Sequence, residues 1–281
     1  RKSEGLDETR AKIAVRRDLA ALYARQQQWA NAAAQGALAV SLAEVLGDPK
    51  LFAAALIDQA RYLRESNDPR RVLVVLDRAG RIIAALDRPG DLLDPLLLRA
   101  ELLFELQMEK EKEAAYEHLL SHTNVDLLRV ELHRAQHTKP DRLGTTYPNR
   151  WERILTLARE AGRQDVVAEA HDALGLAASW SKQYAEAVRH FSAADSAGPP
   201  PNRGIMIWME IIESNTALDR RPAARAAIEK VFALIDPTKE PGRASALHEA
   251  RAELLGRDGD FAAAYQELRA ANELRRRQNA T

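Results

Sequence analysis

The chain alternates amphipathic segments with short clusters of helix-breaking residues along its whole length. Within the segments, apolar residues recur three and four positions apart, which is the period of an α-helix. The nearest approach to a β-strand is the apolar run at 72–76, but Ala79, Ile82 and Ile83 continue it at helical spacing. The breakers are mainly glycine, proline, asparagine and aspartate, which end helices and form turns. This alternation predicts an all-α fold.

The spacing of the breakers predicts about fourteen helices joined by short turns, so that consecutive helices lie antiparallel. The expected helices are 8–26, 29–46, 50–65, 70–86, 92–107, 110–121, 124–137, 149–161, 164–180, 184–197, 203–218, 222–235, 243–256 and 260–278. The exception is the segment 138–148, where Pro140, Gly144 and Pro148 predict an irregular loop. We interpret this loop as either an insertion between repeats or a binding loop.

Composition excludes several classes of function. The 281 residues carry 41 Lys+Arg and 41 Asp+Glu, and this zero net charge argues against broad nucleic-acid binding, which needs a basic excess. The absence of cysteine excludes disulfides, thiolate metal sites and cysteine nucleophiles. Apolar runs fall short of the ~20 residues that cross a bilayer, so we expect no direct membrane insertion.

The first residues, 1–5, are polar and do not begin with methionine. They do not resemble a signal peptide and instead predict a fragment of a longer protein. The compartment is therefore open. A soluble cytoplasmic protein is favoured, and a periplasmic one is the alternative if a targeting segment was removed.

Residues 168–201 combine small and large side chains in a specific pattern over two successive helices. The pattern comprises Leu174, Gly175, Tyr184, Ala187, Phe191 and Pro199. We expect Gly175 and Ala187 to face each other where the helices cross, since only small side chains permit that approach. This spacing closely resembles the tetratricopeptide repeat, a helix pair with a period of about 34 residues.

Weaker copies of the pattern fit 13–46, 53–86, 205–238 and 245–278, and the register is least clear near 95 and 124. The starts at 168, 205 and 245 lie 37 and 40 residues apart, which resembles the long-helix variant in bacterial regulators and sensors. The resemblance implies one α-solenoid over 1–281, a right-handed superhelix of about seven antiparallel helix pairs. Its concave face would be lined by the first helix of each pair. We expect an elongated monomer, and a non-repeating helical bundle is the alternative.

We find no motif typical of an enzyme, such as G-x-S-x-G, a P-loop or G-x-G-x-x-G. His118 and His122, and likewise His133 and His137, stand four residues apart, so each pair could share a metal on one helix face. The glutamate that follows the first histidine in zincins is absent from both pairs. We therefore predict solvated or partly buried histidines, no metal, no cofactor and no catalysis. The run 110–113, Lys-Glu-Lys-Glu, predicts a solvated helix start.

The resemblance implies a protein-interaction module whose protein or peptide partner lies in the concave groove. The alternative is a sensory or regulatory domain of a larger bacterial signalling protein, with a diguanylate cyclase or transcription regulator as its output. The best-known peptide mode of the family is a clamp of lysines and asparagines that grips a C-terminal carboxylate. Its positions here include Arg17, Ala21 and Asp58, so the sequence does not support that clamp.

Transferring the groove positions of the family onto the better-registered repeats gives a set of charged candidate partner-binding residues. They are Arg17, Arg61, Arg64, Glu169, Asp172, Glu213, Glu249 and Glu253. The N-terminal members are basic and the C-terminal members acidic, so we expect a dipolar partner segment with its acidic part toward Arg61. Rim charges mainly set orientation and association rate, so binding should weaken with salt.

Overall fold

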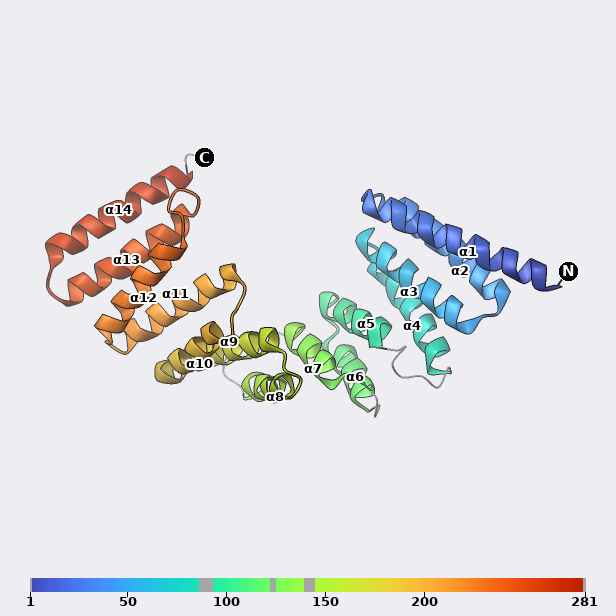
Figure 1. The fold of residues 1–281 in the computed structure, drawn as a ribbon, viewed down its shortest axis with the longest axis horizontal. Helices are drawn as coiled ribbons and strands as arrows, with labels where there is room; N and C mark the ends of the chain where they lie inside the picture. Colours follow the sequence, from blue (N-terminus) through green and yellow to red (C-terminus); the bar gives the residue numbers. More distant parts are fainter. Residues whose placement is uncertain (1, 86–92, 122–124, 139–144, 280–281) are drawn as a thin grey trace. The chain divides into compact units, whose positions relative to one another are not determined.

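A computed structural model describes residues 2–85, 93–121, 125–138 and 145–279 (Figure 1). The described residues form fourteen α-helices joined by turns. Their bounds are α1 Lys2–Arg25, α2 Trp29–Leu46, α3 Pro49–Glu65, α4 Pro69–Ala84, α5 Leu93–Glu105, α6 Glu109–Leu120, α7 Leu127–Gln136, α8 Thr146–Glu160, α9 Gln164–Trp180, α10 Tyr184–Ser196, α11 Pro201–Ala217, α12 Arg221–Leu234, α13 Pro241–Arg257 and α14 Phe261–Asn279. The all-α fold predicted from the sequence is confirmed.

Three helix starts differ from the prediction by three residues or more. Helix α1 begins at Lys2 and continues through Gly5, because a single glycine weakens a helix by only about 1 kcal/mol. Helix α7 begins later than expected, at Leu127, because the Asp126 carboxylate caps it by accepting from the Arg129 N–H at 3.0 Å. Helix α8 begins at Thr146 with Pro148 in its first turn, where the missing N–H of proline breaks no helical bond.

In the part of the chain that the structure describes, seven tight turns between helices share one backbone geometry. Each contains a residue with φ between +53° and +85°, namely Gln27, Asn67, Gln107, Gly162, Lys182, Asp219 or Gly259. The next N–H donates to the carbonyl five positions back, as in Gln28 to Tyr23 at 2.9 Å and Gln183 to Ala178 at 2.8 Å. This is the long bond of the Schellman motif. The Gln107 turn joins α5 and α6, the helix pair in which the sequence pattern is weakest. The backbone geometry of the turn is therefore repeated even where the residue pattern of the repeat is not.

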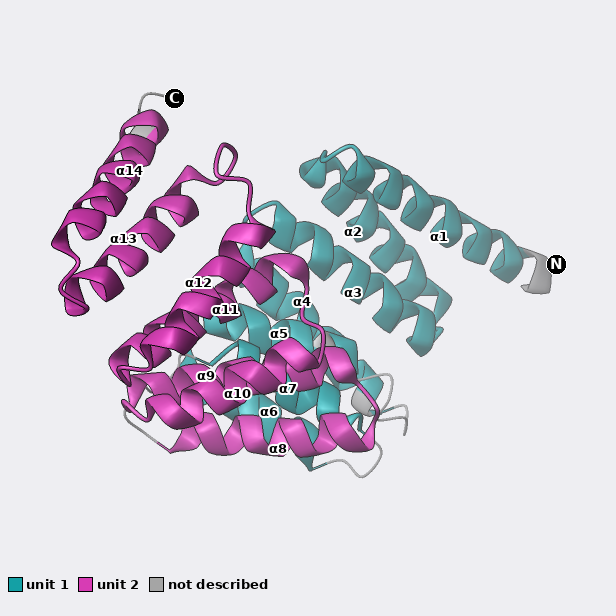
Figure 2. Cartoon of the chain, turned by 60° about the vertical axis from the view of Figure 1, so that its left-hand side comes forward, with its two compact units in different colours: residues 1–138 teal, residues 139–281 magenta. Residues whose placement is uncertain are grey.

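The chain divides into two compact units, residues 1–138 and 139–281 (Figure 2). Unit 1 contains α1–α7 and unit 2 contains α8–α14. The boundary falls in the predicted loop 138–148, of which residues 139–144 lie outside the described part of the chain. The single continuous solenoid over 1–281 stays a prediction.

Each unit has buried apolar clusters that join successive helices. In unit 1, one cluster joins Ile13 of α1 to Leu56 of α3, and another joins Ile83 of α4 to Tyr116 of α6 and Val130 of α7. In unit 2, one cluster runs from α9 to α13. Such nearest-neighbour cores are typical of solenoids.

Candidate functional site

A cleft of about 500 Å³ opens between the first helices of successive pairs in unit 1. Its lining comes from α3, α5 and α7, with Trp29 at the start of α2. The lining residues are Trp29, Arg61, Tyr62, Arg64, Glu65, Asp94, Leu97, Leu98, Glu101, Arg129 and His133. Two residues selected from the sequence, Arg61 and Arg64, therefore line one cleft, together with aromatic and apolar side chains.

Most of the charge in this cleft is already paired. Nη2 of Arg64 lies 2.5 Å from Oε1 of Glu101 and 3.3 Å from Oε1 of Glu105. The guanidinium of Arg129 pairs with Asp94. Arg61 is exposed and forms no ion pair with a residue that the structure describes. Arg61 is thus the cation of the cleft that is available to a partner.

The third basic candidate, Arg17, lies elsewhere in unit 1. It lines a separate cleft of about 590 Å³ between α1 and the α3 region, near Arg10 and Lys50. Its Nε lies 2.7 Å from Oδ2 of Asp58, so its charge is also compensated. These arginines were predicted from their positions in the repeat pattern. That pattern does not include the carboxylates of the facing helix, which pair with Arg17 and Arg64.

The acidic candidates all lie in unit 2. Asp172 is buried at 4% exposure and pairs with Arg203, and burial raises the pKa of its carboxyl although Arg203 opposes this. Glu169 lies near enough to raise that pKa further. On the next first helix, burial and then the charge of Glu213 raise the pKa of Glu210. The charge of Asp172 also raises the pKa of Glu210, so α9 and α11 bring these two carboxyls near each other, although the sequence did not select Glu210.

The two remaining acidic candidates belong to α13, and both are paired. Glu249 pairs with Arg275 of α14, and Glu253 accepts from Arg257 at 2.7 Å within its own helix. Glu213 is exposed and forms no ion pair with a described residue. Each unit therefore has one exposed candidate residue without an ion-pair partner among the described residues. It is the cation Arg61 in unit 1 and the anion Glu213 in unit 2.

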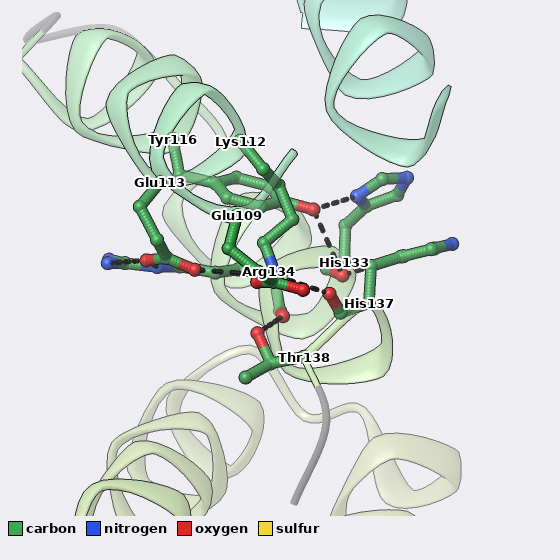
Figure 3. A network of polar contacts seen from close by, with 8 residues as sticks. All are labelled: Glu109, Lys112, Glu113, Tyr116, His133, Arg134, His137 and Thr138. Carbon is green, nitrogen blue, oxygen red and sulfur yellow. Dashed lines mark hydrogen bonds and ion pairs between the residues drawn. The ribbon is translucent and has the colours of Figure 1, made fainter. Parts of the chain in front are cut away.

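A polar network fixes α6 against α7 next to the first cleft (Figure 3). Its centre is Lys112, whose side chain is fully buried and whose ammonium donates to Oε2 of Glu109 at 2.5 Å and to the His137 carbonyl at 2.9 Å. Nearby, Arg134 donates to Glu113 of the facing helix. The predicted solvated helix start at 110–113 is therefore wrong at Lys112, because acceptors on both helices replace its water.

The same network orients two histidines. Nδ1 of His133 lies 2.8 Å from the hydroxyl of the buried Tyr116, and Nδ1 of His137 lies 2.9 Å from the carbonyl oxygen of His133. Burial, followed by the charges of His137 and Arg129, lowers the pKa of His133 to about 4. The two rings stack with centroids 4.2 Å apart. The two rings lie together as their spacing predicted, although His137 stands just past the end of α7, at its C-cap.

Comparison with solved structures identifies the class of fold. The chain is similar to a signal transduction ATPase with numerous domains and a tetratricopeptide repeat sensor from Pyrococcus horikoshii, at 12% identity and a TM-score of 0.73. The match covers 98% of this chain and 43% of that one, so this chain spans less than half of that protein.

Two further tetratricopeptide repeat proteins match over most of both chains. One is the C-terminal part of a Cytophaga hutchinsonii protein, at 13% identity and a TM-score of 0.57, covering 90% of this chain and 94% of that one. The other is from Parabacteroides merdae, at 16% identity and a TM-score of 0.54, covering 94% and 93%. No family model and no curated protein matches the sequence. The chain thus has the α-solenoid fold of tetratricopeptide repeat proteins. None of its described helices is long and apolar enough to cross a membrane.

Proposed function

We propose that the chain is a protein-interaction module that binds a segment of a partner protein in the cleft between α3, α5 and α7. The cleft supports this proposal because rigid first helices present its side chains, so that binding orders little on the receptor side. Trp29 and Tyr62 supply aromatic surface, and Leu97 and Leu98 supply apolar surface. The role is binding rather than catalysis, and no cofactor is part of it.

The observation that carries the proposal is the unpaired charge of Arg61 beside aromatic and apolar surface. A carboxylate of the partner would pair with Arg61 without displacing an ion pair of the protein. An adjacent apolar side chain would bury against Leu97 and Leu98. The partner of unit 1 is therefore an acidic segment with apolar residues, in line with the acidic part expected from the sequence.

Peptides selected from a random library against the parent chain test this proposal. We expect the selected peptides to be rich in aspartate, glutamate and apolar residues. Replacing Arg61→Glu should weaken their binding roughly three- to tenfold, because an attraction becomes a repulsion near the surface. Fluorescence anisotropy of a labelled peptide measures this change, and added salt should weaken the parent complex.

Arg81→Glu is the matched control. Arg81 is an exposed arginine of α4 outside the cleft, and its replacement changes the net charge by the same amount. We expect the control to bind as the parent does. Equal affinity of parent and Arg61→Glu would contradict binding in this cleft, as would equal losses in both variants.

For unit 2, we propose a preference for basic segments. Of the acidic candidates, Asp172 is buried, whereas Glu213 is exposed and without an ion pair to a described residue, so Glu213 would lead the contact. Glu169 would add to the acidic field, whereas arginines compensate the charges of Glu249 and Glu253. A partner with both an acidic and a basic part would satisfy both units.

A sensory or regulatory domain is the second candidate function. Its support is the similarity to a protein whose tetratricopeptide repeats are described as a sensor, over 98% of this chain. In this role, the cleft would bind a signal-bearing segment and the rest of a larger protein would respond. The full-length gene product tests it, since an adjoining output domain is expected and a product without one would contradict it.

A further inference from the structure

Three potential metal ligands converge at the wall of the first cleft, which two of them line. They are Glu101 of α5, His133 of α7, and His137, which is the C-cap residue directly after α7. One ligand atom from each of the three lies within 4.8 Å of the other two. Oε1 of Glu101 and Nε2 of His137 are 3.9 Å apart. The sequence suggested the histidine pair but not Glu101, because Glu101 belongs to another helix.

We propose that Glu101, His133 and His137 form a binding site for a divalent transition metal, with Zn²⁺ as the preferred ion. Two imidazoles and one carboxylate are a common zinc ligand set, in which the fourth position is left to water. In tetrahedral zinc sites with bonds of about 2.0–2.1 Å, ligand atoms lie about 3.4 Å apart. The three side chains therefore need to close by roughly 1 Å, which rotation about their side-chain bonds can supply.

The hydrogen bonds of the two histidines leave the correct nitrogens for a metal. Nδ1 of His137 faces a carbonyl oxygen, which only accepts, so Nδ1 carries the proton and Nε2 carries the lone pair. The Tyr116 hydroxyl lies 3.4 Å from the His133 carbonyl and 2.8 Å from Nδ1 of His133. When the hydroxyl donates to that carbonyl, it accepts from Nδ1–H, and Nε2 of His133 is free as well.

Residues behind the histidines hold both rings in place. Metal-binding histidines usually donate their second N–H to a carbonyl or another acceptor, which fixes the ring and raises its basicity. Here the buried Lys112 anchors the carbonyl of His137, and the Phe104 and His137 rings pack in a T-shaped contact with centroids 5.7 Å apart. In Figure 3, the His133 ring faces the Tyr116 hydroxyl, and the His137 ring lies on the same side as the His133 ring. Contacts within the protein therefore orient the two imidazole rings without a bound ion.

Nearby cations set a limit on affinity. Arg64 pairs with the oxygen of Glu101 that faces His137, and Arg129 lies close enough to affect His133. A carboxylate has a second oxygen for the arginine, and Arg64 also reaches Glu105 at 3.3 Å, so it keeps a partner when the metal binds. The ion competes with Arg64, so we expect moderate rather than extreme affinity. Mg²⁺, which prefers oxygen ligands, should not compete.

The test is a Zn²⁺ titration of the full 281-residue chain, stripped of metal, against a chromophoric chelator. We expect one Zn²⁺ per chain, unaffected by Mg²⁺. Glu101→Gln and His137→Gln should each weaken binding about tenfold or more, while circular dichroism shows the parent helix content. The double variant His118→Gln/His122→Gln removes the other four-residue histidine pair and should bind as the parent does.

Several outcomes would overturn the site. They are a chain that binds no Zn²⁺, equal affinity of the parent and Glu101→Gln, and a control that loses as much as the two ligand variants. If a variant fails to fold, the parent chain is titrated with Co²⁺ instead. The visible absorption of bound Co²⁺ reports its coordination geometry. Strong tetrahedral bands support the site, and the weak bands of an octahedral ion overturn it.

Discussion

At the scale of single residues, Gly175 shows how close two helices of one repeat lie. A Cβ atom placed on Gly175 would lie 2.6 Å from Cδ1 and Cε1 of Phe191, a contact that real side chains do not tolerate. The sequence predicted close approach at Gly175 but placed Ala187 opposite it, whereas the nearest atoms belong to the Phe191 ring. Phe191 is fully buried, so its ring has no free space to enter.

Gly175→Ala should therefore destabilise the protein by about 1–3 kcal/mol, despite the better helix propensity of alanine. Gly80→Ala is the matched control, since Gly80 also lies within a helix and its Cβ would meet nothing within 4 Å. The control should gain up to about 1 kcal/mol. Urea unfolding of both variants measures the difference, and a Gly175→Ala variant as stable as the parent would refute the tight contact.

Lys112 is a residue whose burial could not be predicted from the local sequence pattern. A run of lysine and glutamate on a helix is compatible with full solvation, and nothing local distinguishes Lys112 from Lys110. Lys112 is fully buried because the facing helix supplies the carbonyl of His137, 25 residues away. The helix itself was predictable from its period, but the partner of its side chain depends on how two helices meet.

At the scale of helices, positions were predictable and contacts were not. Periodicity and breakers located all fourteen helices, since each depends on residues a few positions apart. The family slots also selected Arg61 and Arg64 of α3, and both line the same cleft. The ion pair of Arg64 with Glu101 joins residues 37 apart on two helices, so slots alone did not reveal that this charge is neutralised.

Helices α9 and α10 are linked by a chain of hydrogen bonds through two histidines. Arg159 donates to Nε2 of His171 at 3.1 Å, so the proton of His171 lies on Nδ1, which faces Nδ1 of His190 at 3.0 Å. Nε2 of His190 lies 3.2 Å from Glu186. Burial, then His190 and two arginines, lowers the pKa of His171 to about 4, and burial likewise lowers that of His190. A second proton on His171 would make the ring positively charged, and the guanidinium of Arg159 would repel it.

We predict that this link weakens in acid. The unfolded His171 takes up a proton near pH 6.5 and the folded one only near pH 4, so unfolding is favoured progressively as the pH falls through this range. The melting temperature should drop between about pH 7 and about pH 5, and it should drop less in His171→Gln. Carboxylates titrate equally in both proteins and cancel in this comparison. An identical drop in the two would show that His171 does not contribute.

At the scale of the whole molecule, each unit contains enough helices and buried apolar residues to fold independently. Repeat solenoids need about three stacked helix pairs, because one pair cannot bury its apolar face alone. Unit 1 contains seven helices and unit 2 contains seven, and each has its own buried clusters. The sequence predicted the break in the repeats at 138–148, but a repeat period carries no information on whether two stretches fold together or separately.

We therefore expect residues 1–138 and 139–281, produced as separate chains, to fold on their own, each with helical circular dichroism and a cooperative melt. A cut after Asp219 is the control, since it separates Phe191 and Ile207 from Ile228 and Val231 of the same buried cluster. The resulting fragment 220–281 keeps only α12–α14, fewer than the three pairs that a solenoid needs, and should be largely unfolded. If 1–138 or 139–281 is unfolded alone while the full chain is folded, the two units depend on each other for stability. If 220–281 melts cooperatively, the cluster from α9 to α13 is not the unit of folding.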